Sequence, residues 1–193
     1  MPAVIVARTT ELVEDNLAAG TLPCPRCQGR LTKWGFGRRR TIRSHGTATV
    51  TLRPRRVRCS DCASTHIVLP TAFQLRRADT TAVIGDALVH KANGLGHRRI
   101  AARLHRPEST VRRWLRAATP AHLQWMLQRG LQRLIEVAPD ASAELHFAGN
   151  PLRDTLSVLG TAARWDRHRL GFTDSPWTMV GIYTSGRLLA PPG

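Results

Sequence analysis

The chain has 193 residues, with 29 Lys and Arg against 13 Asp and Glu, and a formal net charge of +16 at pH 7. Its hydrophobic content of 42% is ordinary for a globular protein and excludes wholesale disorder. No stretch approaches the roughly 18 consecutive apolar residues of a membrane span, and the apolar run 3–7 is too short for a signal-peptide core. We therefore expect a soluble, cytoplasmic protein with no membrane partner.

Charge and composition divide the chain into four segments. We predict a helical lead-in at 1–20 with a net charge of −2, a basic ribbon at 21–77 with +12, a helix-turn-helix segment at 78–119 with +5, and a helical segment with a coil tail at 120–193 with +1. Such an excess of cations in the second segment would repel itself without a polyanionic partner. We therefore expect nucleic acid as the partner. An anionic membrane surface is the lesser alternative, because no amphipathic basic helix accompanies the charge.

The basic segment contains all the cysteines of the chain, in two Cys-x-x-Cys pairs separated by 31 residues: Cys24, Cys27, Cys59 and Cys62. Two residues between thiolates let one tight turn direct both sulfurs at one ion, and two such turns complete a tetrahedral site. The β-forming runs 31–34 and 47–52 predict an antiparallel hairpin between the pairs. The pattern predicts a zinc ribbon with one structural Zn²⁺, because four thiolates leave no open position for water. A redox motif, unligated thiols or a ligand role for His66 are less favoured alternatives.

The strands of the predicted ribbon carry many arginines. Alternate residues of a strand share a face, so Arg56 and Arg58 should project opposite Val57. Arginine suits planar, bidentate contact with phosphate, whereas a merely solvated face is the alternative. We predict that eight ribbon arginines contact the DNA backbone: Arg38, Arg39, Arg40, Arg43, Arg53, Arg55, Arg56 and Arg58.

Three amphipathic helices are predicted after the ribbon, at 80–93, 97–105 and 109–118, with a turn at 106–108 between the last two. Pro107 is well placed to open the last helix. Its apolar residues recur at the spacing i, i+3, i+4, i+7, which is typical of a helix that buries one face. We expect these helices to pack on one another.

The two helices at 97–118 carry a specific spacing. Ala101 is small enough for close helix packing, and Val111 and Trp114 follow ten and thirteen residues later. This segment resembles the helix-turn-helix of bacterial transcription regulators and transposases, whose second helix enters the major groove. Two residues depart from that pattern: His105 stands where the family usually has Gly, and Pro107 where a Ser or Thr cap is common. An unrelated helical hairpin is the alternative.

The resemblance implies which side chains face DNA. On the second helix, arginine can pair with guanine, Glu can accept from cytosine, and Ser or Thr can bond phosphate or base edges. At the start of the first helix, free backbone N–H groups favour phosphate. The implied contact residues are His97, Arg98, Arg99, Glu108, Ser109, Thr110, Arg112, Arg113 and Arg116.

A four-cysteine ribbon followed by a helix-turn-helix also resembles the DNA-binding N-terminal part of insertion-sequence transposases, and uncharacterised actinobacterial proteins with the same order, over about 21–118. The resemblance implies a bacterial, nucleoid-associated protein that binds double-stranded DNA in a sequence-specific way. It would be a transcription regulator or a transposition accessory factor. A truncated transposase fragment without its catalytic domain, and an RNA-binding zinc-ribbon protein, are the alternatives.

The last segment is predicted to contain helices at 120–137 and 150–169, with extended coil at 171–193. These helices would support self-association or contact with a separately encoded transposase, or simply brace the helix-turn-helix. The 74 residues after position 119 leave no room for an α/β domain with three carboxylates and two Mg²⁺. We therefore predict an α+β protein that is not an enzyme: a zinc ribbon, a helix-turn-helix and C-terminal helices.

Overall fold

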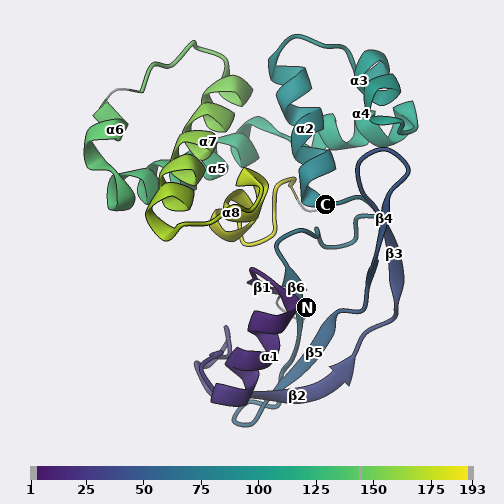
Figure 1. Ribbon diagram of the computed structural model, residues 1–193, viewed down its shortest axis with the longest axis vertical. Coiled ribbons are helices and arrows are strands. Elements are labelled where there is room, and N and C mark those ends of the chain that lie inside the picture. The colour runs from purple at the N-terminus through teal and green to yellow at the C-terminus, as the bar shows by residue number, and fades with distance from the viewer. Residues whose placement is uncertain (1–3, 144, 191–193) are drawn as a thin grey trace.

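The computed structural model describes residues 4–143 and 145–190 and shows an α+β protein in two parts (Figure 1). Strands and one helix form the N-terminal part, and the remaining helices of the described residues follow it in the chain. The predicted fold class is confirmed, because an antiparallel hairpin joins the two cysteine pairs and helices follow it.

A four-stranded sheet forms the base of the N-terminal part. Its strands are β1 (Val4–Ala7), β2 (Leu31–Phe36), β5 (Arg55–Cys59) and β6 (Thr65–Pro70), in the order β1-β6-β5-β2. β1 runs parallel to β6, and the other neighbours are antiparallel.

The first 20 residues are only partly helical, so the predicted helical lead-in is wrong for Val4–Ala7, which form a strand; residues 1–3 lie outside the described residues. A run of four or five apolar residues is too short for its periodicity to distinguish a strand from a helix. Here the parallel pairing with β6 decides for a strand. The helix α1 (Thr10–Ala19) follows, with the Thr9 side chain accepting from the amide of Leu12.

The helix α1 covers one face of this sheet. Val13 and Leu17 of α1 pack with Leu31, Val57 and Val68 of the strands in one buried cluster. Alternate residues of a strand point to opposite faces, so the neighbours of these residues lie on the face that α1 does not cover.

The hairpin continues beyond the sheet. β3 (Arg40–Arg43) pairs with β4 (Thr49–Leu52), and this ribbon extends the β2–β5 pair toward the helical part (Figure 1). At the joint, the Gly37 amide donates to the Pro54 carbonyl over 2.8 Å. A Cβ at Gly37 would lie 2.9 Å from the Pro54 ring, so a side chain there would force the two strands apart.

The next helices are α2 (Thr81–Ala92), α3 (His97–Leu104) and α4 (Glu108–Ala117), close to the predicted bounds. α3 and α4 are joined by a turn of three residues, in which His105 adopts the left-handed conformation with φ 52°. A β-carbon disfavours that conformation, which explains why glycine is common at such a turn. The helices share one buried cluster, which includes Ile100, Ala101, Val111 and Trp114.

The remaining helices are α5 (Pro120–Val137), α6 (Pro139–Ala143), α7 (Pro151–Leu170) and α8 (Pro176–Tyr183). α5 and α7 were predicted. The predicted coil over 171–193 is wrong where α8 forms; positions 191–193 lie outside the described residues. α8 has no amphipathic period, because it is short and apolar, and its burial comes from packing on the other helices. No helix within the described ranges is long and apolar enough to cross a membrane.

The two parts are joined through buried polar contacts of the segment that follows β6. The Thr81 hydroxyl donates to the Thr71 carbonyl over 2.7 Å, and Gln74 accepts from the amide of Leu188 over 3.0 Å. A Cβ at Gly181 of α8 would lie 2.9 Å from the Thr71 side chain, so the two parts approach closely here. The segment that follows β6 is thus fixed to the helical part.

Candidate metal centre and nucleic-acid interface

The two cysteine pairs form matching turns. In the first turn, the amide of Cys24 donates to the Gly29 carbonyl over 2.9 Å; in the second, the amide of Cys59 donates to the Ser64 carbonyl over 2.9 Å. The residue after each second cysteine adopts a positive φ, 63° at Gln28 and 57° at Ala63. Both turns therefore fold each pair of sulfurs toward one point.

The sulfurs of Cys24, Cys27, Cys59 and Cys62 meet at that point, all within 4.8 Å of one another. The Cys24–Cys62 separation is 3.8 Å and the Cys27–Cys59 separation is 3.5 Å. Thiolates about 2.3 Å from a tetrahedral ion would lie about 3.8 Å apart. The cluster can therefore hold one metal ion with little rearrangement.

The pKa values of the cysteine thiols show why the cluster would need a bound cation to ionise fully. Hydrogen bonds from Ser64 are the main cause that lowers the pKa of Cys62, to about 6. The Gly29 amide acts to lower the pKa of Cys27, but the neighbouring sulfurs of Cys59, Cys62 and Cys24 outweigh it and raise that pKa to about 12. Four thiolates in one place repel one another, so only a bound cation stabilises all of them in the ionised form.

His66 lies beside the cluster. This side chain is only 3% exposed, and its Nε2 lies 3.4 Å from the Sγ of Cys24. It does not belong to the group of four sulfurs that lie within 4.8 Å of one another. An N–H at Nε2 would donate to a thiolate, which orients the ligand. This contact could not be predicted from the sequence, because the strand β6, which carries His66, was not predicted.

The predicted ribbon arginines do not share one surface. Arg38, Arg39, Arg53 and Arg56 are exposed, and Arg40 and Arg58 are half-buried. Val57 is fully buried, so the predicted alternation around it is confirmed.

Arg43 and Arg55 have other partners. Arg55 pairs with Glu14 of α1 at 2.5 Å, and its side chain is 10% exposed. Arg43 pairs with Asp79 at 2.7 Å. The structure therefore does not support phosphate contact by these two residues, because carboxylates already occupy their guanidinium groups.

A buried ion-pair network fixes the hairpin tip to the turn between α3 and α4. Asp79 is 1% exposed, and it accepts from the Nε of Arg106 over 2.6 Å and from Arg43 over 2.7 Å. The Arg106 guanidinium also donates to the carbonyls of Ser44 and Gly46 at the hairpin tip. A buried charge is tolerated only when it is paired and hydrogen-bonded, as here. We call these contacts among Arg43, Asp79, Arg106 and the tip the clamp.

The face of α4 opposite the core is rich in polar and basic side chains. Val111 and Trp114 are buried, and the predicted contact residues Glu108, Ser109, Arg112, Arg113 and Arg116 are exposed, with Thr110 half-buried. At the start of α3, Arg98 and Arg99 are exposed and His97 is half-buried. Arg98 lies 3.6 Å from Glu108, a distance that indicates only a weak surface ion pair. The structure thus brings the two predicted helix sets together.

One basic residue near α4 was not among the predicted contacts. Arg77 is half-buried, and its pKa is lowered by burial and by the positive charge of Arg113. The repulsion between two nearby cations is relieved when an anion binds between them. No sequence signal distinguished Arg77 from the other arginines, because its proximity to α4 depends on how residues 70–80 fold back.

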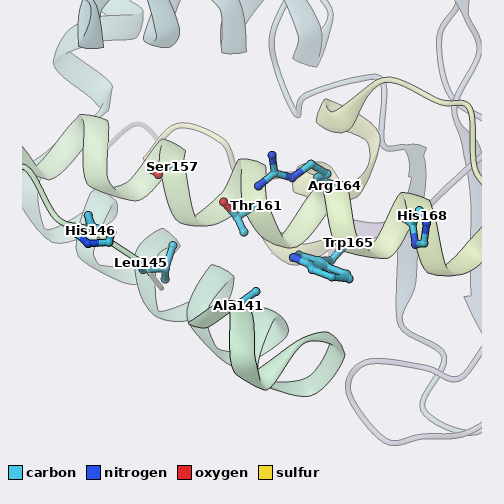
Figure 2. A pocket seen from close by; sticks show the side chains of 8 residues that line it. All are labelled: Ala141, Leu145, His146, Ser157, Thr161, Arg164, Trp165 and His168. Carbon is cyan, nitrogen blue, oxygen red and sulfur yellow. The ribbon is translucent and has the colours of Figure 1, made fainter. Parts of the chain in front are cut away.

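A cavity of about 530 Å³ lies between α6 and α7 (Figure 2). His146, Ser157, Thr161, Arg164, Trp165 and His168 line it, together with small and aliphatic residues. No carboxylate of the described residues lines this cavity, so it does not offer the ligands of a catalytic Mg²⁺ pair. Self-association through the C-terminal helices and the absence of enzyme activity stay predictions.

Residues 24–114 match a family model described as a domain of unknown function, DUF6431. The match begins at the first cysteine of the cluster and ends at Trp114 on α4. It therefore includes both cysteine turns, the hairpin, the clamp, α3 and most of α4. No curated protein and no solved structure matches this chain.

Proposed function

We propose that this chain is a sequence-specific double-stranded DNA-binding protein, a transcription regulator or a transposition accessory factor. In this proposal α4 reads bases, the ribbon hairpin contacts the DNA backbone, and one structural Zn²⁺ holds the ribbon. The observation that carries it is the exposed basic face of α4, fixed beside the hairpin tip by the clamp.

The case for base readout depends on side-chain chemistry. Arg112, Arg113 and Arg116 extend from the exposed face of α4, and no ion pair among the described residues engages them. A helix fits the major groove, and arginine forms two hydrogen bonds with the O6 and N7 of guanine. Burial and the positive charge of Arg113 lower the pKa of Arg77, and a DNA phosphate beside α4 would relieve the repulsion between these two cations.

The hairpin supplies a second basic surface with a different role. Arg38 and Arg39 lie exposed between β2 and β3, and Arg53 lies exposed between β4 and β5, on the opposite side of the joint of the hairpin. Phosphate contacts of this kind fix the register of a protein on DNA but carry no sequence information. The clamp fixes the tip of the same hairpin to the turn before α4, so both surfaces would engage one duplex.

The cysteine cluster fits zinc. Four sulfurs at tetrahedral spacing form the most common closed ligand set for structural Zn²⁺. Cys24, Cys27, Cys59 and Cys62 would hold the ion, and the ion would cross-link the two ends of the hairpin. His66 would donate a hydrogen bond to the Cys24 thiolate from outside the ligand set.

The decisive experiment begins with selection of bound sequences from a random duplex pool. Affinity for the selected duplex and for a scrambled duplex is then measured by fluorescence anisotropy. We expect Arg112→Ala and Arg113→Ala each to cost roughly 1–3 kcal/mol on the selected duplex and much less on the scrambled one. Arg169→Ala, which removes an exposed arginine of α7, is the matched control and should change neither affinity.

Two outcomes would overturn the proposal. If selection enriches no sequence, α4 does not read bases. If both α4 variants lower the two affinities equally, the helix contacts only the backbone. Tighter binding of an RNA duplex or hairpin than of any selected DNA would favour the alternative of an RNA-binding ribbon protein.

A further inference from the structure

One face of the four-stranded sheet is open where β2 and β5 pair, whereas the C-terminal end of β6 on the same face is buried against the β3–β4 hairpin. Thr32 pairs with Arg58 and Arg58 with Thr65, so the side chains of these residues project to the same side. This side is opposite to Leu31 and Val57, which α1 buries. Trp34 belongs to the open side too, because the guanidinium of Arg58 lies 4.7 Å from the centroid of its ring.

Trp34 is unusually accessible for a large aromatic residue in a strand. About half of its surface, 49%, is exposed, although Arg58 of β5, which lies against its ring, is half-buried. The bulge between Lys33 and Phe36, where Gly35 has φ 97°, separates Trp34 from the side chains that face α1. An exposed tryptophan on an open sheet face is an incomplete contact, which a flat partner would complete.

The charge around Trp34 selects the kind of partner. Arg56 is exposed and Arg58 is half-buried on this open face, and no ion pair within the described residues engages either of them. Glu14, the nearest acidic residue of α1, is on the other side and pairs with Arg55 and Lys33. The face therefore offers an aromatic ring beside two cations that have no carboxylate partner, and one of these cations, Arg58, lies against the ring itself. This arrangement suits a flat ligand attached to anions.

A single nucleic-acid strand has this chemistry. Its unpaired bases can stack on an aromatic ring, and its phosphates can contact arginine. The bases of a duplex are stacked on one another and expose only their edges, so a ring on a flat sheet cannot reach their faces. An arginine at the indole ring adds a cation–π contact that also tolerates any base.

We infer that this open face, defined by Trp34, Arg56 and Arg58, binds an unpaired DNA strand, with a base stacked on Trp34 and phosphates on the two arginines. The inference deepens the proposed function and in part rests on it: α4 would hold a duplex, and the clamp would keep the open face at a fixed position beside it. The protein would then prefer DNA in which a duplex adjoins a single strand.

The test is an anisotropy titration of the full-length, metal-loaded protein with labelled (dT)15 and with the selected duplex. Trp34→Ala should weaken binding of (dT)15 at least about fivefold, because one base loses its stacking partner. Trp34→Phe keeps an aromatic ring and should weaken it less than about threefold. Trp165→Ala is the matched control, because Trp165 on α7 has a similar exposure of 41%. None of these variants should change affinity for the duplex.

The outcomes separate this inference from the proposed function. Wild-type affinity of Trp34→Ala for (dT)15, with metal content and circular dichroism unchanged, would overturn the inference. Equal weakening of (dT)15 and duplex would also overturn it, because the face would then be a general DNA surface. If (rU)15 binds more than tenfold tighter than (dU)15, the strand is RNA and the inference is wrong. Failure to bind any duplex, with Trp34-dependent binding of (dT)15, would remove the proposed function and leave this face as a strand-binding site.

Discussion

The main core of the ribbon has seven buried residues, two of them cysteines, whereas the core shared by the helices has 16 buried hydrophobic residues. A core as small as that of the ribbon buries too little apolar surface to stabilise the fold of a separate module. Small modules of this type therefore depend on disulfides or metal ions. The helical part has no such need. One chain thus combines a metal-dependent part with a self-sufficient part, joined by the clamp and by the contacts around Thr71.

Removal of the metal should have the largest effect and should separate the two parts. Apparent binding free energies of structural Zn²⁺ are about 10–16 kcal/mol, which exceeds the stability of a small domain. We expect a strong chelator, or Cys59→Ser, to abolish amide protection in residues 22–70 and to preserve it in α5 and α7. Hydrogen exchange followed by mass spectrometry measures both regions in one sample.

The control for this experiment is Ala48→Ser, which places the same side chain at the exposed hairpin tip. Its exchange pattern should match the wild type. Loss of protection in α5 and α7 together with the ribbon would show that the helical part is not self-sufficient. Full protection of the ribbon without metal would show that the cluster is not a structural metal site.

Disruption of the clamp should have the second-largest effect on the stability of the protein. Asp79→Ala leaves the guanidinium of Arg106, only 3% exposed, buried without its carboxylate, and should lower the free energy of unfolding by about 3–5 kcal/mol. The matched control is Asp174→Ala, which removes the partly exposed pair of Asp174 with Arg8 and should cost about 0–1 kcal/mol. Urea unfolding at neutral pH measures both. Equal effects of the two variants would mean that the clamp is no stronger than a surface ion pair.

A smaller effect is expected within the helical part, at the Asp166 carboxylate. Burial opposes ionisation of Asp166, but hydrogen bonds from Arg133 and Tyr183 outweigh burial and lower its pKa. Tyr183→Phe removes the 2.5 Å hydrogen bond from the phenol and should cost about 1.5–3 kcal/mol at pH 7. Because the pKa is lowered in the folded state, this contribution is present above the ordinary pKa of an aspartate and is lost as pH falls below it.

The measurement is the difference in unfolding free energy between wild type and Tyr183→Phe, as a function of pH. The difference should be constant from neutral pH down to about pH 5 and should shrink below that. Ser142→Ala, which removes an exposed hydroxyl-to-carbonyl bond, should show a smaller and pH-independent difference. A difference for Tyr183→Phe that grows as pH falls would contradict the sign of the Asp166 shift.

The smallest effect concerns the role of the hairpin in DNA binding. Arg39→Ala removes one exposed cation from the ribbon and should weaken selected and scrambled duplexes alike. The slope of log affinity against log salt concentration should become shallower by about one unit for each lost phosphate contact. Titrations at four salt concentrations, with Arg169→Ala as the control, measure this slope. An unchanged slope would remove Arg39 from the DNA surface.

Regular local patterns were the features that could be predicted. The bounds of α2, α3, α4, α5 and α7 follow from apolar spacing and from proline or glycine at their ends, which are properties of short stretches of sequence. The four sulfurs were predicted for the same reason, since each Cys-x-x-Cys turn is local. α8 and β1 were not predicted, because a short apolar segment takes the structure that its neighbours in space impose.

Contacts between residues far apart in the sequence determine which of the other arginines belong to the candidate surface. Arg43, Arg55 and Arg77 are similar residues in the sequence, yet the first two pair with carboxylates that are distant in the chain and the third lies near α4. The open face around Trp34 could not be predicted from the sequence either, because its exposure depends on which side of the sheet α1 covers.

Charge, turn spacing and helical periodicity depend on residues close together in the chain, so a basic N-terminal region, four clustered thiols and a pair of helices with a buried stripe follow from the amino-acid order. Three other properties depend on the folded arrangement: which arginines have no carboxylate partner, how the hairpin is held against α3 and α4, and which part of the sheet is uncovered. Those properties depend on the burial and pairing of side chains far apart in the sequence. A charge reaches its partner only when the chain brings the two together.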